Sequence, residues 1–324
     1  MKRIAILTSG RDVSGSNAAI RAVVRSAISK GISVFGVSNG FRGLYEDHIE
    51  QLSSRDVSGR IGKASSFIGT SHSFEYLDES KIQTILANLN RKSIDGLIIV
   101  GGSGSFALSR RLSSKGLPIV GVPASIQDDI VGTDICLGVD SAVNSIMGSI
   151  DHIRSCDSSR NRSFLVGVEG RFSGSLALRS AIVSGAEACL IPEFSTDNLE
   201  EIAKSMGAQV DGGKTQCIAI VAAGWKPGID ALSKFLEEHE HETDLLVRKT
   251  VLGYVQRGGS PSGFDRLLGT NFGDEAVNML TDGCNEQFVA IQGNHYVRVP
   301  FAETIDRWKT VDEASYKTFM HTTK

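Results

Sequence analysis

Short apolar runs alternate with helical patterns along the whole chain. The runs with little polar alternation are residues 3–8, 33–38, 96–102, 118–123, 163–168, 188–192 and 217–224. Strands of this kind are typical of parallel sheets that helices cover on both faces. Helical periodicity follows most of them, as in residues 16–29 and 174–185. The pattern predicts an α/β protein with layered, mainly parallel sheets and right-handed crossovers.

Length and composition narrow the class of protein. The chain has 324 residues, 41% of them hydrophobic, and a formal net charge of −3. That length usually divides into two domains, and the charge gives no reason to expect nucleic acid or a membrane as partner. No apolar run approaches the ~20 residues of a membrane span. The N-terminal MKRIAILTSG predicts a strand, because its apolar stretch is too short for a signal peptide.

The cysteines are widely spaced, at positions 136, 156, 189, 217 and 284, and no CxxC pair occurs. A metal site is therefore not expected. An odd, scattered set fits reduced thiols in a cytoplasmic protein. His239 and His241 lie in the acidic run EEHEHE, which fits a solvated helix end better than a metal site.

Glycine-rich turns follow the apolar runs in four segments, residues 7–21, 100–111, 168–178 and 253–266. Backbone N–H groups at a helix N-terminus attract anions, and the helix dipole adds to this attraction. None of the segments matches GxGxxG in a dinucleotide-binding context or the P-loop. Together they favour a phosphorylated ligand, although each alone also fits an ordinary packing turn.

A set of motifs stands in one recognisable order: TSGRDVSGSNAAIRAVVR, GFRGLYED, FIGTS, IVGGSGS, GVPASIQDDIVGTD, GRFSG and TVLGYVQRGGSPSGFDR. Their order and spacing resemble those of the bacterial-type ATP-dependent 6-phosphofructokinases, to about residue 305. The resemblance implies two three-layer α/β domains with mainly parallel sheets. The larger domain would comprise 1–138 and 257–305, and the smaller one 139–256 and 306–324. It also implies a cleft active site, a tetramer-like assembly, and an ATP- and Mg²⁺-dependent transfer to fructose 6-phosphate.

The catalytic loop departs from the family, whose loop reads TIDND. Gln127 stands where the family has the aspartate that acts as base, Asp128 replaces asparagine and Ser125 replaces threonine. Asp129 and Arg171 are kept. An amide has no usable basicity, and losing a general base typically costs about 10²–10⁴-fold in rate. The resemblance thus implies weak or lost phosphotransfer.

The residues at the family's nucleotide-binding positions also differ from those of the family. Arg11 replaces a glycine that lets backbone approach a phosphate, and Ser103 replaces the aspartate that works with Mg²⁺, so no metal ligand is expected there. Leu108, expected in the turn after GGSGS, would crowd the nucleotide. The other members of this degraded site are His72, Ser73, Gly104 and Ser105.

The residues implied for the sugar phosphate are largely kept. They are Arg162 and Arg248, which would come from a neighbouring subunit, with Gly170, Tyr254 and Arg257. Tyr254 replaces a histidine and can still donate a hydrogen bond. Glu169 replaces methionine, and Gly224 aligns with a glutamate that binds the sugar. By residue type, the phosphate contacts are kept and the sugar-ring contacts are damaged.

Arg21 and Arg25 lie four residues apart on one predicted helix face. Alone they fit a solvated surface, but the resemblance implies an effector site. Its residues would be Arg21, Arg25, Arg55, Ser58, Arg154, Gly185, Glu187 and Lys214. Arginine forks suit phosphate oxygens, so this site should still bind an anion.

Several hypotheses follow. The first is a catalytically impaired regulatory subunit that binds phosphorylated effectors or fructose 6-phosphate and assembles with itself or with a competent phosphofructokinase. In it, Arg11 is expected to pair with Asp128, Asp129 or Glu169, because an isolated cation in a cleft is costly. The second is an active kinase that uses Asp128 or Asp129 with ATP and Mg²⁺; pyrophosphate is a weaker variant as donor. The third is a sensor acting alone through the effector pocket.

Overall fold

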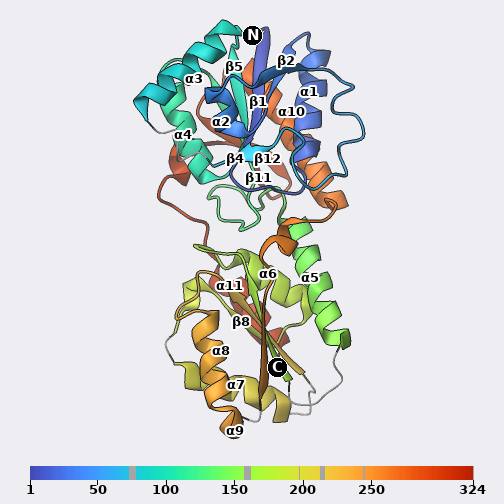
Figure 1. Cartoon of the computed structure of the whole chain (residues 1–324), viewed down its shortest axis with the longest axis vertical. Coiled ribbons are helices and arrows are strands. Elements are labelled where there is room, and N and C mark those ends of the chain that lie inside the picture. Colours follow the sequence, from blue (N-terminus) through green and yellow to red (C-terminus); the bar gives the residue numbers. More distant parts are fainter. Residues whose placement is uncertain (73–77, 157–161, 197, 212–215, 244, 324) are drawn as a thin grey trace. The chain divides into compact units, whose positions relative to one another are not determined.

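The structure, a computed structural model, describes residues 1–72, 78–156, 162–196, 198–211, 216–243 and 245–323. The chain forms two compact units (Figure 1). Unit 1 comprises Met1–Ile126, Ile130–Ser141 and Gly258–Arg307. Unit 2 comprises Gln127–Asp129, Ala142–Arg257 and Trp308–Lys324. The short piece 127–129 therefore belongs to a different unit from the residues on either side of it.

One mixed sheet forms the centre of unit 1. Its strands are β1 (Arg3–Ser9), β2 (Ser33–Val37), β3 (Ile49–Leu52), β4 (Thr70–Ser71), β5 (Gly96–Gly101), β6 (Ile119–Pro123), β11 (Gln287–Gln292) and β12 (His295–Pro300). Within the described residues their order is β12-β11-β6-β5-β1-β2-β3, and β4 pairs with the end of β1. The inner pairings are parallel, and the edge strands β3 and β12 are antiparallel to their neighbours.

Helices cover both faces of this sheet. They are α1 (Ser16–Ser29), α2 (Gly40–Tyr45), α3 (Glu79–Arg91), α4 (Ser103–Ser113), α10 (Gly263–Thr281) and the 3₁₀ turn η4 (Phe301–Thr304). In Figure 1, α1 and α10 lie together on one side and α3 and α4 on the other. A Cβ at Gly273 would overlap the Ala19 carbonyl oxygen, so only glycine lets α10 approach α1 this closely.

Unit 2 contains a fully parallel sheet in the described residues, with the strands β7 (Arg162–Val168), β8 (Ala188–Leu190), β9 (Gln216–Ala222) and β10 (Leu246–Val251). Their order is β10-β7-β9-β8. The helices are α5 (Val139–Cys156), α6 (Ser175–Ser184), α7 (Leu199–Asp211), α8 (Ile229–Glu238), α9 (Glu240–Thr243) and α11 (Glu313–Thr322), with the 3₁₀ turns η2 (Pro192–Phe194) and η3 (Gly253–Arg257).

The core of unit 2 follows from the alternation of its strands. Leu165 and Val221 point to one sheet face and pack there with Met206 of α7, Leu236 of α8 and the fully buried Trp225. Burying one such large apolar side chain contributes roughly 1.5–3 kcal/mol. Because the strands are parallel, the loops after β7, β9 and β10 gather at one edge of the sheet, which is where the candidate site lies.

The α/β fold with mainly parallel sheets is confirmed, and so is the helix over 16–29. The expectation that Leu108 lies in a turn is wrong. Leu108 is within α4 and is fully buried, because the helix begins at Ser103 directly after the glycines. Leu108 therefore belongs to the core of unit 1. No helix in the described part of the chain has the length and apolarity needed to cross a membrane.

The motif GGSPSGFDR links two segments of unit 1 through hydrogen bonds. Ser262 caps α10 by accepting from the Asp265 amide, and the buried Asp265 carboxylate accepts from the Gly138 and Ser141 amides at 2.8 Å each. Burial raises the pKa of Asp265 above its ordinary value, although the hydrogen bonds from Ser141 and Gly138 oppose this. The Asp265 carboxylate thereby joins α10 to the start of α5.

Candidate functional site

Residues 127–129 are anchored to unit 2 by their polar groups. The side-chain oxygen of Gln127 accepts a hydrogen bond from the Arg171 backbone amide at 2.9 Å. The Asp129 backbone carbonyl accepts from the Lys309 amide at 3.0 Å. The amide oxygen at position 127 therefore has a structural partner already, in the loop that follows β7.

Asp128 is the most enclosed acidic residue of this segment. Its side chain is fully buried, and its backbone has a left-handed φ of 53°, a conformation that aspartate tolerates better than most residues. The carboxylate accepts from Ser175 Oγ and Lys309 Nζ, each at 2.8 Å, and Arg179 lies 3.5 Å away. A hydroxyl and a lysine thus contact the carboxylate inside unit 2, with an arginine close by.

The C-terminal segment 308–311 completes this arrangement. Trp308 stacks on Phe172 with 4.3 Å between ring centroids, next to the Lys309 contacts with residues 128 and 129. The Val311 amide donates to Glu193 Oε1 at 3.0 Å, and the same carboxylate accepts from the Gly174 amide at 2.9 Å. The segment therefore binds both the piece 127–129 and the loop after β7.

The loop after β7 closes over the turn after β9. The Gly224 amide donates to the Gly170 carbonyl at 2.8 Å, and a Cβ at Gly224 would overlap the Arg171 carbonyl oxygen. Gly170 has a φ of +133°, which favours glycine. Position 224 therefore has no room for the glutamate side chain that the resemblance placed there.

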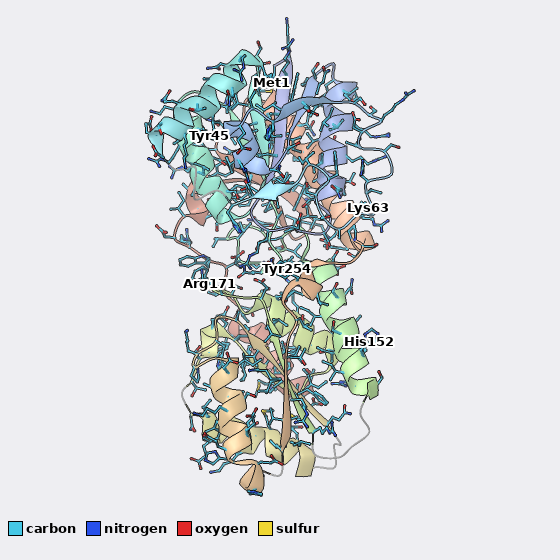
Figure 2. All side chains as sticks on the ribbon, in the orientation of Figure 1. Met1, Tyr45, Lys63, His152, Arg171 and Tyr254 are labelled. Atoms are coloured by element: carbon cyan, nitrogen blue, oxygen red, sulfur yellow. The ribbon has the colours of Figure 1, made fainter. Side chains whose placement is uncertain are left out.

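Glu169 and Arg257 form an ion pair at the same edge of the sheet, with side chains 14% and 15% exposed. The Arg257 guanidinium lies 4.9 Å from the ring centroid of Tyr254, which is itself 84% exposed. Figure 2 shows Arg171 and Tyr254 at this one end of the unit 2 sheet. The arginine implied for phosphate binding thus has an internal carboxylate partner.

Arg162 and Arg248 lie elsewhere in unit 2. Arg162 begins β7, and Arg248 pairs in register with Phe164, so both point to one face near the amino end of β7. Arg257 follows the carboxyl ends of the strands. β7 has seven residues, so its ends are about 20 Å apart at ~3.3 Å per residue. Arg162 is therefore at the opposite end of β7 from Arg257, and Arg248, in register with Phe164, is about 13 Å from the carboxyl end of that strand at ~3.3 Å per residue.

The nucleotide-side residues belong to unit 1. Arg11 follows β1 and is exposed, and Ser103, Gly104 and Ser105 open α4. Ser105 Oγ donates to Ser9 Oγ at 2.8 Å, which joins the first turn of α4 to the end of β1. Ser125, after β6, is half-buried, His72 is exposed, and Ser73 lies outside the described residues. The pairing of Arg11 with an acidic residue of unit 2 stays a prediction.

The implied effector residues fall into two sets. In unit 1, Arg21 and Arg25 share α1, and the Ser58 amide donates to the Arg55 carbonyl at 3.0 Å. In unit 2, Arg154 donates to the Gly185 carbonyl at 2.8 Å and lies 3.9 Å from Glu187. The structure thus brings the three unit 2 residues together. Lys214 lies outside the described residues.

Several contributors escaped the sequence analysis. Lys309, Arg179 and Ser175 all contact Asp128, and Glu193 joins two backbone segments. One signal was available: an aspartate needs a cation nearby when it is buried. The sequence alone does not identify the lysine or arginine that supplies it.

The fold and these contacts define a class: a two-unit α/β protein with arginines and carboxylates at the carboxyl ends of parallel strands. The family model described as Phosphofructokinase matches residues 3–280. The chain is 40% identical over 319 residues to the ATP-dependent 6-phosphofructokinase of Thermotoga neapolitana, covering 98% of each chain. It is 40% identical over 317 residues to the protein of that name from Bacillus pumilus, again covering 98% of each. This chain therefore belongs to the phosphofructokinase family.

Solved structures agree with this membership. Phosphofructokinase of Pichia pastoris in the T-state superposes with a TM-score of 0.87 at 30% identity, over 99% of this chain and 37% of that one. Phosphofructokinase of Saccharomyces cerevisiae gives a TM-score of 0.85 at 30% identity, over 100% of this chain and 47% of that one. This chain spans less than half the length of those two solved chains.

Proposed function

We propose that this protein is a catalytically impaired phosphofructokinase-family protein. It binds phosphorylated effectors and fructose 6-phosphate, and it acts as a regulatory subunit of an assembly with a competent phosphofructokinase chain. The observation that carries the proposal is the state of residues 127 and 128. Position 127, where the resemblance puts the proton acceptor, holds an amide bonded to the Arg171 backbone.

Asp128 is a poor substitute for the missing base. To take a proton from a sugar hydroxyl, its carboxylate would have to leave Ser175 and Lys309 and turn out of a fully buried position. This movement is costly, because Lys309 and Arg179 would each lose their counterion. Phosphoryl transfer depends on positioning and on charge neutralisation, and both suffer if the loop must rearrange first.

Contacts to the sugar and the metal are reduced as well. Gly224 leaves no space for a sugar-binding carboxylate beside Arg171. Mg²⁺ prefers carboxylate oxygens, whereas Ser103 offers only a hydroxyl where the resemblance puts an aspartate. In the described part of the chain no group of three or more His, Cys, Asp or Glu side chains can hold a metal ion. A hydroxyl at position 103 is a weaker Mg²⁺ ligand than a carboxylate, and no step of the proposal uses the ion.

The direct test is a steady-state assay of the purified chain with ATP, Mg²⁺ and fructose 6-phosphate. A complete family member, such as the Bacillus pumilus relative, serves as the control in the same buffer. Turnover at least about 10²-fold below the control is expected, because the general base is missing. Turnover within tenfold of the control would contradict catalytic impairment.

An active kinase is the second candidate, and the 40% identity over 98% of the chain to proteins named ATP-dependent 6-phosphofructokinase favours it. In that case Asp129 or Asp128 is the base, and Asp129→Asn or Asp128→Asn abolishes the turnover. If turnover is present and neither change lowers it, neither aspartate is the base, and this form of the second candidate is wrong.

A further inference from the structure

The Glu169–Arg257 pair joins the carboxyl ends of two neighbouring parallel strands. Glu169 follows β7, and Arg257 ends η3 directly after β10. The Glu169 amide donates to the buried Gln256 side chain at 3.0 Å, and Gln256 donates to the Gly253 carbonyl at 3.0 Å. The acidic residue is therefore fixed to the same turn that carries Arg257. The guanidinium is held between this carboxylate and the Tyr254 ring.

We propose that Glu169 is a specificity-determining residue: its carboxylate acts as an internal competitor for Arg257 and makes this end of the site disfavour phosphate. The inference rests on the proposed function, because it takes Arg257 as a group that meets the sugar phosphate. It deepens that function by assigning to one residue the control of the affinity for fructose 6-phosphate relative to that for the unphosphorylated sugar.

A phosphate group can reach Arg257 in two ways, and both are unfavourable. A phosphate monoester carries about −1.5 to −2 charges at pH 7. If it displaces Glu169, a carboxylate that is only 14% exposed loses its cation. If it binds beside Glu169, two anions share one guanidinium, and like charges in contact strongly disfavour the complex. Either route lowers affinity for the phosphorylated ligand.

A neutral sugar hydroxyl does not meet this obstacle. A hydroxyl can donate to the Glu169 carboxylate and accept from the Arg257 guanidinium, so it can join the ion pair without breaking it. The pair thus remains a recognition element for polyhydroxyl compounds. The ratio of the affinities for fructose 6-phosphate and fructose is the quantity that Glu169 controls.

Substitution of Glu169 tests this ratio in the full-length protein by ligand-observed NMR titration. Glu169→Gln keeps the shape and removes the charge. We expect affinity for fructose 6-phosphate to rise at least about tenfold and affinity for fructose to change by less than about threefold. Glu169→Met, which introduces the residue that the resemblance puts at this position, should shift the ratio in the same direction. Thermal unfolding of both variants verifies that each is folded.

Two controls separate this mechanism from a general charge effect. Glu200→Gln removes the same charge from a residue of α7 that is 71% exposed and pairs with Lys204, and it should leave both affinities unchanged. Arg257→Gln added to Glu169→Gln should reverse the gain, because the gain requires the guanidinium.

The inference is overturned if neither Glu169 variant moves the fructose 6-phosphate affinity by more than about twofold. It is equally overturned if the gain persists without Arg257, or if fructose affinity rises in parallel. Turnover of the wild-type chain, measured on the same samples, tests the proposed function separately. Brisk turnover would contradict catalytic impairment, whereas the ratio of the two affinities in the Glu169 variants would still test the role of Glu169.

Discussion

At the scale of single residues, the loop 127–129 illustrates how two neighbouring substitutions depend on distant ones. Gln127 could be interpreted from the sequence, because an amide in place of a base has one chemical meaning. The environment of Asp128 could not, because Lys309 is 181 residues away in the chain. Contacts of this kind follow no helical or strand period, so only the tertiary structure reveals them. The same holds for Glu169 and Arg257, which are 88 residues apart.

Lys309→Met should destabilise unit 2, because it removes the ammonium that lies 2.8 Å from the buried Asp128 carboxylate, whereas Arg179 lies farther away, at 3.5 Å. Breaking a fully buried pair costs about 3–5 kcal/mol. Lys309 is 22% exposed, so a loss of about 2 kcal/mol is expected. Urea unfolding measures it.

The matched control is Lys317→Met, which removes a lysine that is 61% exposed and pairs with Glu313 on α11. It should have no measurable effect. The double variant Asp128→Asn with Lys309→Met should recover part of the loss, because the amide needs no counterion. Equal stability of the Lys309 variant and the wild-type chain would show that the pair adds nothing.

At the scale of elements, the sequence predicted best where strands are buried on both faces. β1, β5 and β6 are such strands, and their apolar runs coincide with the observed bounds within a residue or two. β10 was not predicted from the sequence, because it is an edge strand with four of its six residues exposed, and three of those four carry polar side chains. The C-terminal residues also carried no functional signal, although segment 308–311 binds the piece 127–129 and α11 packs beside α6.

Phe319→Ala should show that α11 is an integral part of unit 2. Phe319 is 1% exposed, and truncating a buried phenylalanine leaves a cavity that costs about 3–5 kcal/mol. Met320→Ala changes the adjacent residue, which is 43% exposed, and should cost far less. Thermal unfolding of the two variants measures the contrast. Similar losses in both would mean that α11 is not anchored through Phe319.

At the scale of the whole molecule, family membership does not by itself establish the chemistry of this chain. The fold and the family are shown by a match over residues 3–280 and by 40% identity to named enzymes. A shared fold does not establish a shared activity, which depends on the site. The departures named above, such as Gln127 and Ser103, lie in or next to the loops at the strand ends. Selection for folding and assembly without selection for turnover would leave this distribution.

Assembly is the remaining consequence of the regulatory proposal. Arg162 lies about 20 Å along β7 from the edge that carries Arg257, and Arg248, in register with Phe164, lies about 13 Å from it, at ~3.3 Å per residue. In the regulatory proposal, a second chain supplies the arginines that complete the phosphate site. We expect native mass spectrometry of the complex isolated from its own cell to show a second phosphofructokinase-family chain with an aspartate at its general-base position. Recombinant chain mixed with that partner should raise the partner's affinity for fructose 6-phosphate, whereas an Arg162→Ala, Arg248→Ala variant that still assembles should not. An isolated complex that contains this chain alone would contradict the mixed assembly, since no competent active site would then be present for the arginines to complete.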